Sequence, residues 1–178
     1  MQKYKTCFGI EISVAELLKV GSVADLQALL STANSLKDFT VVGGGSNIIF
    51  DDARSHRIIL IDIKGIDLTP NPYPAETGEV VLKVGAGEVW DEVVAFAVEH
   101  DLQGVEALSA IPGTAGAVPV QNIGAYGSEI KDVLEKVEVV NRATGELQVL
   151  ENKDCKFSYR NSIFKNEFKN KYIITAIY

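Results

Sequence analysis

The segment Ala110–Glu129 reads AIPGTAGAVPVQNIGAYGSE and decides how this part of the chain must fold. It contains four glycines, at positions 113, 116, 124 and 127, together with two prolines and few charged residues. A helix is disfavoured here, because glycine costs about 1 kcal/mol and proline about 3 kcal/mol relative to alanine in a helix interior. Such a sequence suits a backbone that passes close to a bound group and directs N–H groups toward it.

A second glycine-rich segment, Val41–Asn47 (VVGGGSN), precedes it in the chain. Two such loops, each beside an apolar run, predict one large phosphate-bearing cofactor that contacts both. Taken alone, Gly43–Asn47 fits a tight turn between two strands equally well. It is not a Walker A loop, because no Gly-Lys-Ser/Thr follows, and it lacks the Gly-x-Gly-x-x-Gly fingerprint that enters a helix.

The long stretch 104–127 either wraps a cofactor or forms an Ω-loop held by structural turns. Its length and apolar character favour a functional loop, because unstructured loops longer than about 12–15 residues are usually functional or disordered. Glycines three residues apart predict tight turns at Gly113–Gly116 and Gly124–Gly127.

The composition limits the classes of partner. The chain has 178 residues, 47% of them hydrophobic, which suffices for one domain or two small lobes. A net charge of −7 argues against general binding of nucleic acid or anionic membranes. One cluster of basic residues is a candidate for lining a local basic pocket. The alternative is that these residues lie on the surface and serve solubility: Lys153, Lys156, Arg160, Lys165, Lys169 and Lys171.

No secretory leader or membrane span is expected, because no apolar run approaches the ~20 residues needed to cross a bilayer, so a cytoplasmic protein is predicted. The two cysteines, Cys7 and Cys155, do not form a disulfide framework and are expected to be buried or half-buried side chains. No spacing of cysteine or histidine indicates a metal site.

Apolar periodicity predicts an α+β fold, since strands outnumber helices and do not alternate regularly with them. Ser22 and Asp25 form a capping box for a helix that ends near Asn34. A helix over 88–100 buries one apolar face. The predicted strands are 39–42, 48–50, a buried strand over 57–63, 79–84, the hairpin 136–140 with 147–150, and 172–177.

Four strings along the chain resemble the UDP-N-acetylenolpyruvoylglucosamine reductase (MurB) family, flavoenzymes of bacterial cell-wall synthesis. They are, in order, Gly43–Asn47, Ile111–Gly113, Gln121–Gly127 and Ser158–Lys165. The strings QNIGAYG and YRNSIFK are specific, whereas related flavin oxidases carry loops similar to GGGSN. The resemblance runs along the whole chain.

The resemblance implies a two-lobed α+β FAD-binding domain of the vanillyl-alcohol oxidase / p-cresol methylhydroxylase (PCMH) type, with residues 1–64 and 65–178 as its lobes and FAD between them. The C-terminal substrate domain of the family is expected to be absent, because the sequence stops inside an apolar run. The residues expected at the cofactor are Gly43, Gly44, Gly45, Ser46, Asn47, Ile111, Pro112, Gly113, Gly116, Gln121, Asn122, Gly124, Ala125 and Tyr126.

The family uses NADPH and FAD to reduce UDP-N-acetylglucosamine enolpyruvate to UDP-N-acetylmuramate. The resemblance implies that Arg160 is catalytic, pairing with the enolpyruvyl carboxylate, and that Tyr159 lines the same substrate site. The serine and late glutamate of the family would lie in the missing domain, so this chain alone is expected to bind FAD and to be inactive. FAD should be held non-covalently, because residues 43–47 and 104–129 contain no histidine or cysteine.

Two alternatives stay open. One is another FAD-dependent oxidase or dehydrogenase of the same fold, which the string Tyr159–Ser162 argues against. The other is a non-catalytic flavin-binding fragment. The expected partners are the small molecules NADPH and the UDP-sugar, with no nucleic acid, no membrane and no metal, and the oligomeric state is not determined by the sequence.

Overall fold

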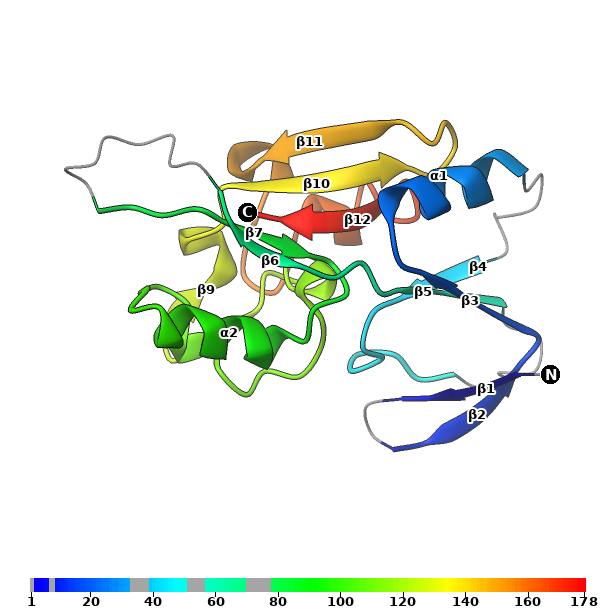
Figure 1. The fold of residues 1–178 in the computed structure, drawn as a ribbon, viewed down its shortest axis with the longest axis horizontal. Coiled ribbons are helices and arrows are strands. Elements are labelled where there is room, and N and C mark those ends of the chain that lie inside the picture. The colour runs from blue at the N-terminus through cyan, green and yellow to red at the C-terminus, as the bar shows by residue number, and fades with distance from the viewer. Residues whose placement is uncertain (1, 7–8, 33–38, 51–56, 70–77) are drawn as a thin grey trace.

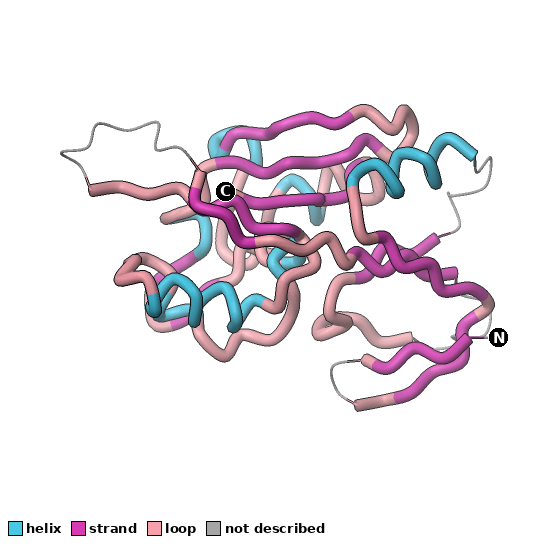
Figure 2. The backbone as a smooth tube through the Cα atoms, viewed as in Figure 1, coloured by secondary structure: helices cyan, strands magenta, loops and turns pink. Residues whose placement is uncertain are grey.

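Two sheets share one hydrophobic core in the computed structural model, which describes residues 2–6, 9–32, 39–50, 57–69 and 78–178. Figure 1 shows the smaller sheet beside the N-terminal hairpin and the larger sheet near the C-terminus. The loops of the middle of the chain lie with the second helix beneath the larger sheet (Figure 2). Cys7 and the predicted end of the first helix lie outside the described residues.

The first sheet is parallel and has the strand order β3-β5-β4. In its central strand, Ile58 packs with Tyr4 and Val14 beneath the N-terminal hairpin, whereas Ile59 and Ile61 face the main core. Burial on both faces explains the continuous apolar run predicted here. The elements of this part are β1 (Gln2–Lys5), β2 (Glu11–Val14), β3 (Glu16–Val20), α1 (Val23–Thr32), β4 (Phe39–Val42) and β5 (Arg57–Ile61).

The second sheet is antiparallel and has the order β11-β10-β12-β7-β6. The predicted hairpin and the predicted final strand are both confirmed. The elements here are β6 (Ile66–Leu68), β7 (Leu82–Gly85), α2 (Trp90–Glu99), a short hairpin of β8 (Gly124–Ala125) and β9 (Ser128–Glu129), β10 (Lys136–Asn141), β11 (Leu147–Glu151) and β12 (Tyr172–Ile177).

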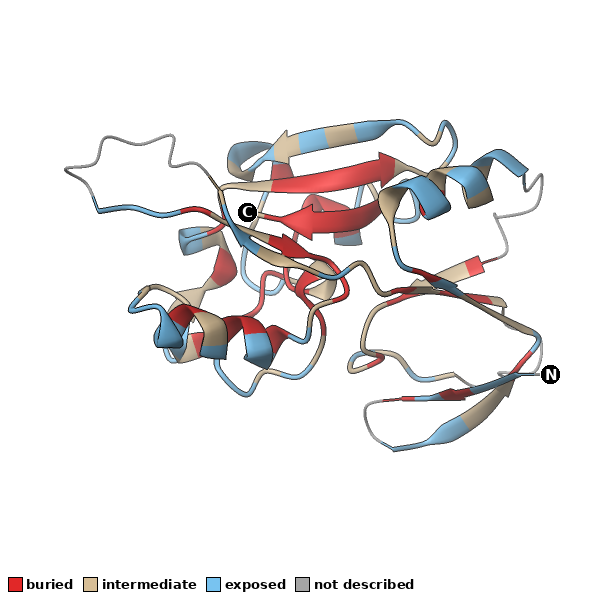
Figure 3. Ribbon diagram, in the orientation of Figure 1, coloured by how far each residue is buried: buried red, intermediate tan, exposed pale blue. Residues whose placement is uncertain are grey.

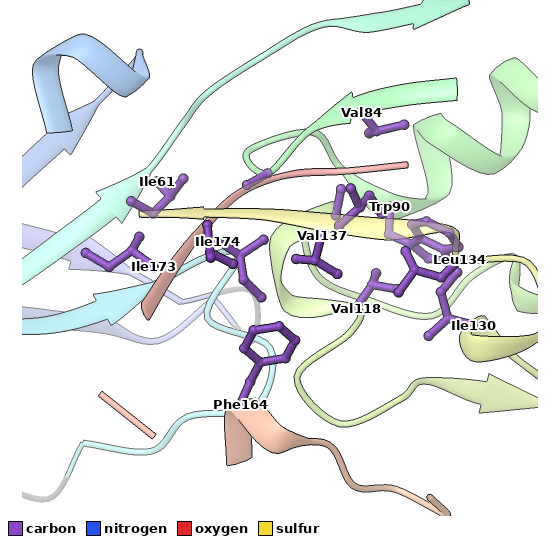
Figure 4. Packing of buried hydrophobic residues seen from close by; sticks show 14 of the residues in the cluster. Ile61, Val84, Trp90, Val118, Ile130, Leu134, Val137, Phe164, Ile173 and Ile174 are labelled. Atoms are coloured by element: carbon purple, nitrogen blue, oxygen red, sulfur yellow. The ribbon is translucent and has the colours of Figure 1, made fainter. Parts of the chain in front are cut away.

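The main core joins both sheets to α2 and the central loops. Strands β10 and β12 are buried along most of their length, whereas β11 alternates at the sheet edge (Figure 3). Ile61 of the first sheet and Ile173 of β12 belong to this cluster, as does Phe164 from a turn below the sheet (Figure 4). The two sheets are therefore packed as one unit.

The predicted strand over 48–50 is wrong: Ile48–Phe50 has no regular secondary structure. The reason is topological, because β4 and β5 are parallel neighbours and cannot be joined by a tight turn. After the glycine loop, the chain must return to the other end of the sheet before β5 begins. The N-terminal strands β1, β2 and β3 are only four or five residues long and were not predicted.

The two predicted helices form, with local differences. Ser22 Oγ accepts a hydrogen bond from the Asp25 N–H at 3.1 Å and donates to Asp25 Oδ2 at 2.7 Å. In a capping box, the Asp25 carboxylate would instead accept a hydrogen bond from the backbone N–H of Ser22. The predicted face of α2 is buried apart from Val98, which is exposed. No helix in the described ranges is both long and apolar enough to cross a membrane.

Candidate functional site

The two glycine-rich loops meet at a pocket of about 580 Å³. Ser46 Oγ donates to the carbonyl oxygen of Pro112 at 3.0 Å, and Asn47 Nδ2 donates to Gln121 Oε1 at 3.3 Å. Segments far apart in sequence thus form one wall. Ten of the residues expected at a cofactor line this pocket: Gly43, Gly44, Gly45, Ser46, Asn47, Ile111, Pro112, Gly113, Gly116 and Gln121.

Gly43 is required by the close approach of the loops. A Cβ atom built on Gly43 would overlap the side-chain oxygen of Thr114, and one on Gly44 would lie 3.3 Å from the Gly113 Cα. A side chain at either glycine would therefore press on the second loop, at the Thr114 hydroxyl or at the Gly113 backbone. The triple glycine therefore contacts the second loop, and it does not form a tight turn between two strands, because Ile48–Phe50 has no regular secondary structure.

The first turn of α2 holds the second loop in place. The Trp90 N–H donates to Gly113 O at 3.0 Å, and the indole N–H of Trp90 donates to Leu108 O at 2.9 Å. Asp91 Oδ1 accepts from the Ala110 N–H at 2.7 Å and from Ser109 Oγ at 2.8 Å. These two hydrogen bonds, that of Ala110 first, lower the pKa of Asp91 below its ordinary value. Asp91 is thus a structural clamp on the loop.

Where the loops meet, unpaired donors gather. Four backbone N–H groups at this junction make no hydrogen bond among the described residues: those of Gly43, Gly44, Gly113 and Thr114. The Thr114 hydroxyl is also buried without a partner in the described part of the chain. Successive free N–H groups form concavities that suit anions such as phosphate.

The charges around the pocket also favour an anion. Its lining includes three cations, Arg142, Lys165 and Lys169, and no aspartate or glutamate among the described residues. This bias is notable in a chain whose net charge is −7. Arg142 donates to the carbonyl oxygen of Phe39 at the start of β4, and burial lowers the pKa of its guanidinium. The pocket therefore combines an apolar wall with an anion-attracting one.

Four of the predicted cofactor residues lie elsewhere. Asn122 is fully buried, donating from Nδ2 to Ser158 O at 3.0 Å and accepting at Oδ1 from the Lys131 N–H at 3.2 Å. Gly124, Ala125 and Tyr126 belong to the β8–β9 hairpin and do not line the pocket. Tyr126 is 96% exposed, and its φ of 52° with 88° at Gly127 gives the tight turn that the glycine spacing predicted.

Tyr159 and Arg160 sit on a neighbouring exposed turn outside the pocket lining. The guanidinium of Arg160 donates to Gly124 O at 2.7 Å, which ties this turn to the β8–β9 hairpin. Lys165 Nζ donates to Arg160 O at 3.2 Å. Lys165 lines the pocket, so the turn and the pocket are adjacent parts of one surface.

Several pocket residues were missed by sequence reasoning. Thr114 and Phe164 lie inside quoted strings but were not singled out, whereas Phe168 and Arg142 carry no motif that marks them. The basic cluster did signal Lys165 and Lys169, whereas Lys156 of the same cluster pairs with Glu167 at 2.9 Å. The described residues contain no group of three or more side chains suited to hold a metal ion.

Comparison with known proteins agrees with this geometry. Residues 14–151 match the sequence profile described as FAD binding domain. UDP-N-acetylenolpyruvoylglucosamine reductase from Shewanella sp. (strain ANA-3) is 42% identical over 171 residues, covering 96% of this chain and 49% of that protein. The chain thus spans about half the length of the curated relatives it matches.

Two solved structures share the fold. The crystal structure of UDP-N-acetylenolpyruvylglucosamine reductase (MurB) from Thermus caldophilus has a TM-score of 0.71 at 24% identity, covering 99% of this chain and 60% of that one. The crystal structure of p-cresol methylhydroxylase with substrate bound has a TM-score of 0.59 at 18% identity, and the match covers 90% of this chain and 34% of that one. The predicted α+β fold of the PCMH type is confirmed. The motif resemblance is confirmed as well, and the chain belongs to the FAD binding domain family.

Proposed function

We propose that this chain binds FAD non-covalently in the pocket between its glycine loops and forms the FAD-binding part of a UDP-N-acetylenolpyruvoylglucosamine reductase. One observation carries the proposal: the backbone N–H groups of Gly43, Gly44 and Gly113 meet at one pocket. Among the described residues they have no hydrogen-bond partner, and the lining has no carboxylate. A dinucleotide diphosphate needs such donors, and its ring systems need the apolar remainder. The two lobes would be residues 1–64 and 65–178.

Residues of both loops would hold the cofactor. The free N–H groups would donate to the diphosphate, while Ile111 and Val120, which line the pocket, would contact the flavin ring. Lys165 and Lys169 would reduce the cost of bringing a charged ligand there. A covalent attachment is not expected, since neither loop contains histidine or cysteine.

When bound, FAD supplies the hydride transfer from NADPH to the enolpyruvyl group of UDP-N-acetylglucosamine enolpyruvate. Arg160 would pair with the carboxylate of that group and stabilise the charge that develops beside it. Its guanidinium already donates to Gly124 O, so the side chain is oriented before a ligand arrives. Tyr159, which is 82% exposed, would line the same substrate site.

We propose that the protein acts in the cytoplasm, in peptidoglycan precursor synthesis, and so contributes to cell-wall biogenesis, cell shape and division. NADPH and the UDP-sugar would be its partners, with neither nucleic acid nor membrane. Without further catalytic residues from a substrate-binding part, this chain by itself would reduce little or no UDP-sugar.

Retention of FAD after gel filtration tests the proposal directly. We expect the chain to keep a flavin absorption band that is released on denaturation, and Gly43→Ala to lose most of it, because the new Cβ overlaps Thr114. Gly21→Ala is the matched control, since nothing lies within 4 Å of a Cβ at that position. Circular dichroism establishes that both variants fold. An unmodified, folded chain that retains no FAD would refute the proposal.

A further inference from the structure

Thr114 has a buried hydroxyl without a hydrogen-bond partner in the described part of the chain. Three buried side-chain oxygens lack a hydrogen-bond partner among the described residues: Thr6 Oγ1, Thr114 Oγ1 and Glu135 Oε2. Of these, only Thr114 lines the pocket. The residue as a whole is 9% exposed. Because buried polar groups in folded proteins nearly always have a partner, this exception calls for an explanation.

The Thr114 hydroxyl is directed at the first glycine loop. Its Oγ1 is the nearest atom to a Cβ built on Gly43, and its Cγ2 lies 3.6 Å from one built on Gly44. The backbone N–H groups of Gly43, Gly44 and Thr114 itself make no hydrogen bond within the described ranges. The hydroxyl thus belongs to a group of unused donors on both sides of the loop junction, where the described lining supplies no acidic acceptor.

We propose that the Thr114 hydroxyl donates a hydrogen bond to a phosphate oxygen of the bound dinucleotide, so that Thr114 is a binding residue of this site. The inference rests on the proposed function, because it requires FAD in the pocket. A hydroxyl can donate to a charged oxygen while its own lone pairs need no partner. Such charge-assisted bonds are shorter and stronger than neutral ones.

The unpaired hydroxyl has opposite effects in the free and the bound protein. Without ligand, the hydroxyl has given up its hydrogen bonds to water and formed none in their place, so it lowers the free energy of unfolding. With ligand the same group contributes a hydrogen bond. Removing it should therefore weaken FAD binding without destabilising the ligand-free fold, whereas removal of a merely structural hydroxyl would destabilise that fold.

The test compares Thr114→Val, which keeps the shape, with Thr114→Ser, which keeps the hydroxyl. We expect Thr114→Val to bind FAD about 10-fold to 100-fold more weakly, the loss of one hydrogen bond to a charged group. The Tm of its ligand-free form should be unchanged or higher. Thr114→Ser should retain most of the affinity. In ³¹P NMR of bound FAD, Thr114→Val should shift a phosphate resonance while the flavin absorption band stays in place.

Each other result would overturn the inference. Equal FAD affinity in Thr114→Val, or an equal loss in Thr114→Ser, would exclude the hydroxyl as a ligand contact. A lower Tm or failure to fold of ligand-free Thr114→Val would make the hydroxyl structural. A shifted flavin band with unchanged ³¹P resonances would assign the contact to the ring. Failure of the unmodified chain to bind FAD is distinguishable from all of these, because it refutes the proposed function itself.

Discussion

Arg160 shows at the residue scale how a proposed substrate contact is held. Its φ of 52° lies in the left-handed region, which costs a residue with a side chain of order 1–3 kcal/mol. The bridge between Ser158 and Asn161 and the hydrogen bond to Gly124 O maintain this conformation. Strained backbone conformations of this kind cluster at active sites and ligand-binding positions.

For Arg160→Lys we expect kcat/KM for the enolpyruvyl substrate to fall about 100-fold or more in an active reductase that contains this chain, because lysine cannot make the bidentate pair. FAD retention should be unchanged, since Arg160 does not line the pocket. Steady-state NADPH oxidation and the flavin band measure the two effects. Unchanged kcat/KM would remove Arg160 from the substrate site.

Cys155 predicts a pH dependence of stability. Burial, followed by the nearby Asp154 and Glu151, raises the pKa of its thiol to about 12. The ordinary value is 9.0, so the contribution of the protonated thiol to stability is fully present below that pH and is lost as pH rises toward 12. We measure the free energy of unfolding in urea for the unmodified chain and for Cys155→Val. Between pH 8 and 10.5 it should fall by about 2 kcal/mol more in the unmodified chain than in the variant. An equal pH dependence of the free energy of unfolding in both proteins would contradict this role of the Cys155 thiol.

At the element scale, α2 matters because its first turn anchors the loop that ends at Gly113. Trp90 and Asp91 each hold one part of that loop by hydrogen bonds. Ala110, whose N–H donates to Asp91 Oδ1, has a φ of 61°. A backbone conformation of this kind persists when neighbouring groups enforce it. The position of Ile111–Gly113 in the pocket therefore depends on a helix that contacts the pocket only through Trp90.

Asp91→Ala should release this loop. We expect the amide of Ala110 to lose its protection from hydrogen exchange and the affinity for FAD to fall several-fold. Glu92→Ala in the same helical turn is the control, and it should change neither quantity. In the unmodified chain the lowered pKa of Asp91 keeps the carboxylate ionised to below about pH 3.9, so protection should persist above that pH and disappear as pH falls through the lowered pKa. Unchanged exchange in Asp91→Ala would show that Asp91 does not hold the loop.

At the scale of the whole molecule, the pocket lies where the two sheets join. Besides the shared core, the turn after β10 contacts the first sheet and its helix. Arg142 donates to Phe39 O, and Gln27 Nε2 donates to Gly145 O at 2.8 Å. The pocket lining includes Phe39 and Ile61 from the first sheet and Ile173 from the second. Any separation of the sheets would therefore open the pocket.

The shared core predicts one cooperative unfolding transition. Trp90 is the only tryptophan and packs in the main core, so its fluorescence reports on the part of the core nearest α2. Its thermal transition should coincide with that of far-ultraviolet circular dichroism, which reports on both sheets. FAD at about 100 times its Kd should raise the free energy of unfolding by about 2.7 kcal/mol, and unfolding should remain a single transition. Two separate transitions would show that the lobes unfold independently.

The sequence by itself determined the α+β class, the buried face of α2, the β10–β11 hairpin and ten of the residues that line the pocket. These are local properties: apolar periodicity, turn glycines and motif strings are written in consecutive residues. It also marked Lys165 and Lys169 as part of a basic cluster. It did not predict the three N-terminal strands, whose pairing partners rather than their own residues stabilise them.

Only the tertiary structure decided which residues meet. In the folded protein Thr114 lies against Gly43, and Asp91 accepts a hydrogen bond from the loop at Ala110. Asn122 lies outside the pocket, where its buried side chain donates to Ser158 O. The physical reason is that these contacts join residues distant in the chain. Their distances depend on how β4, α2 and the second sheet pack around one core, and no local pattern encodes that packing.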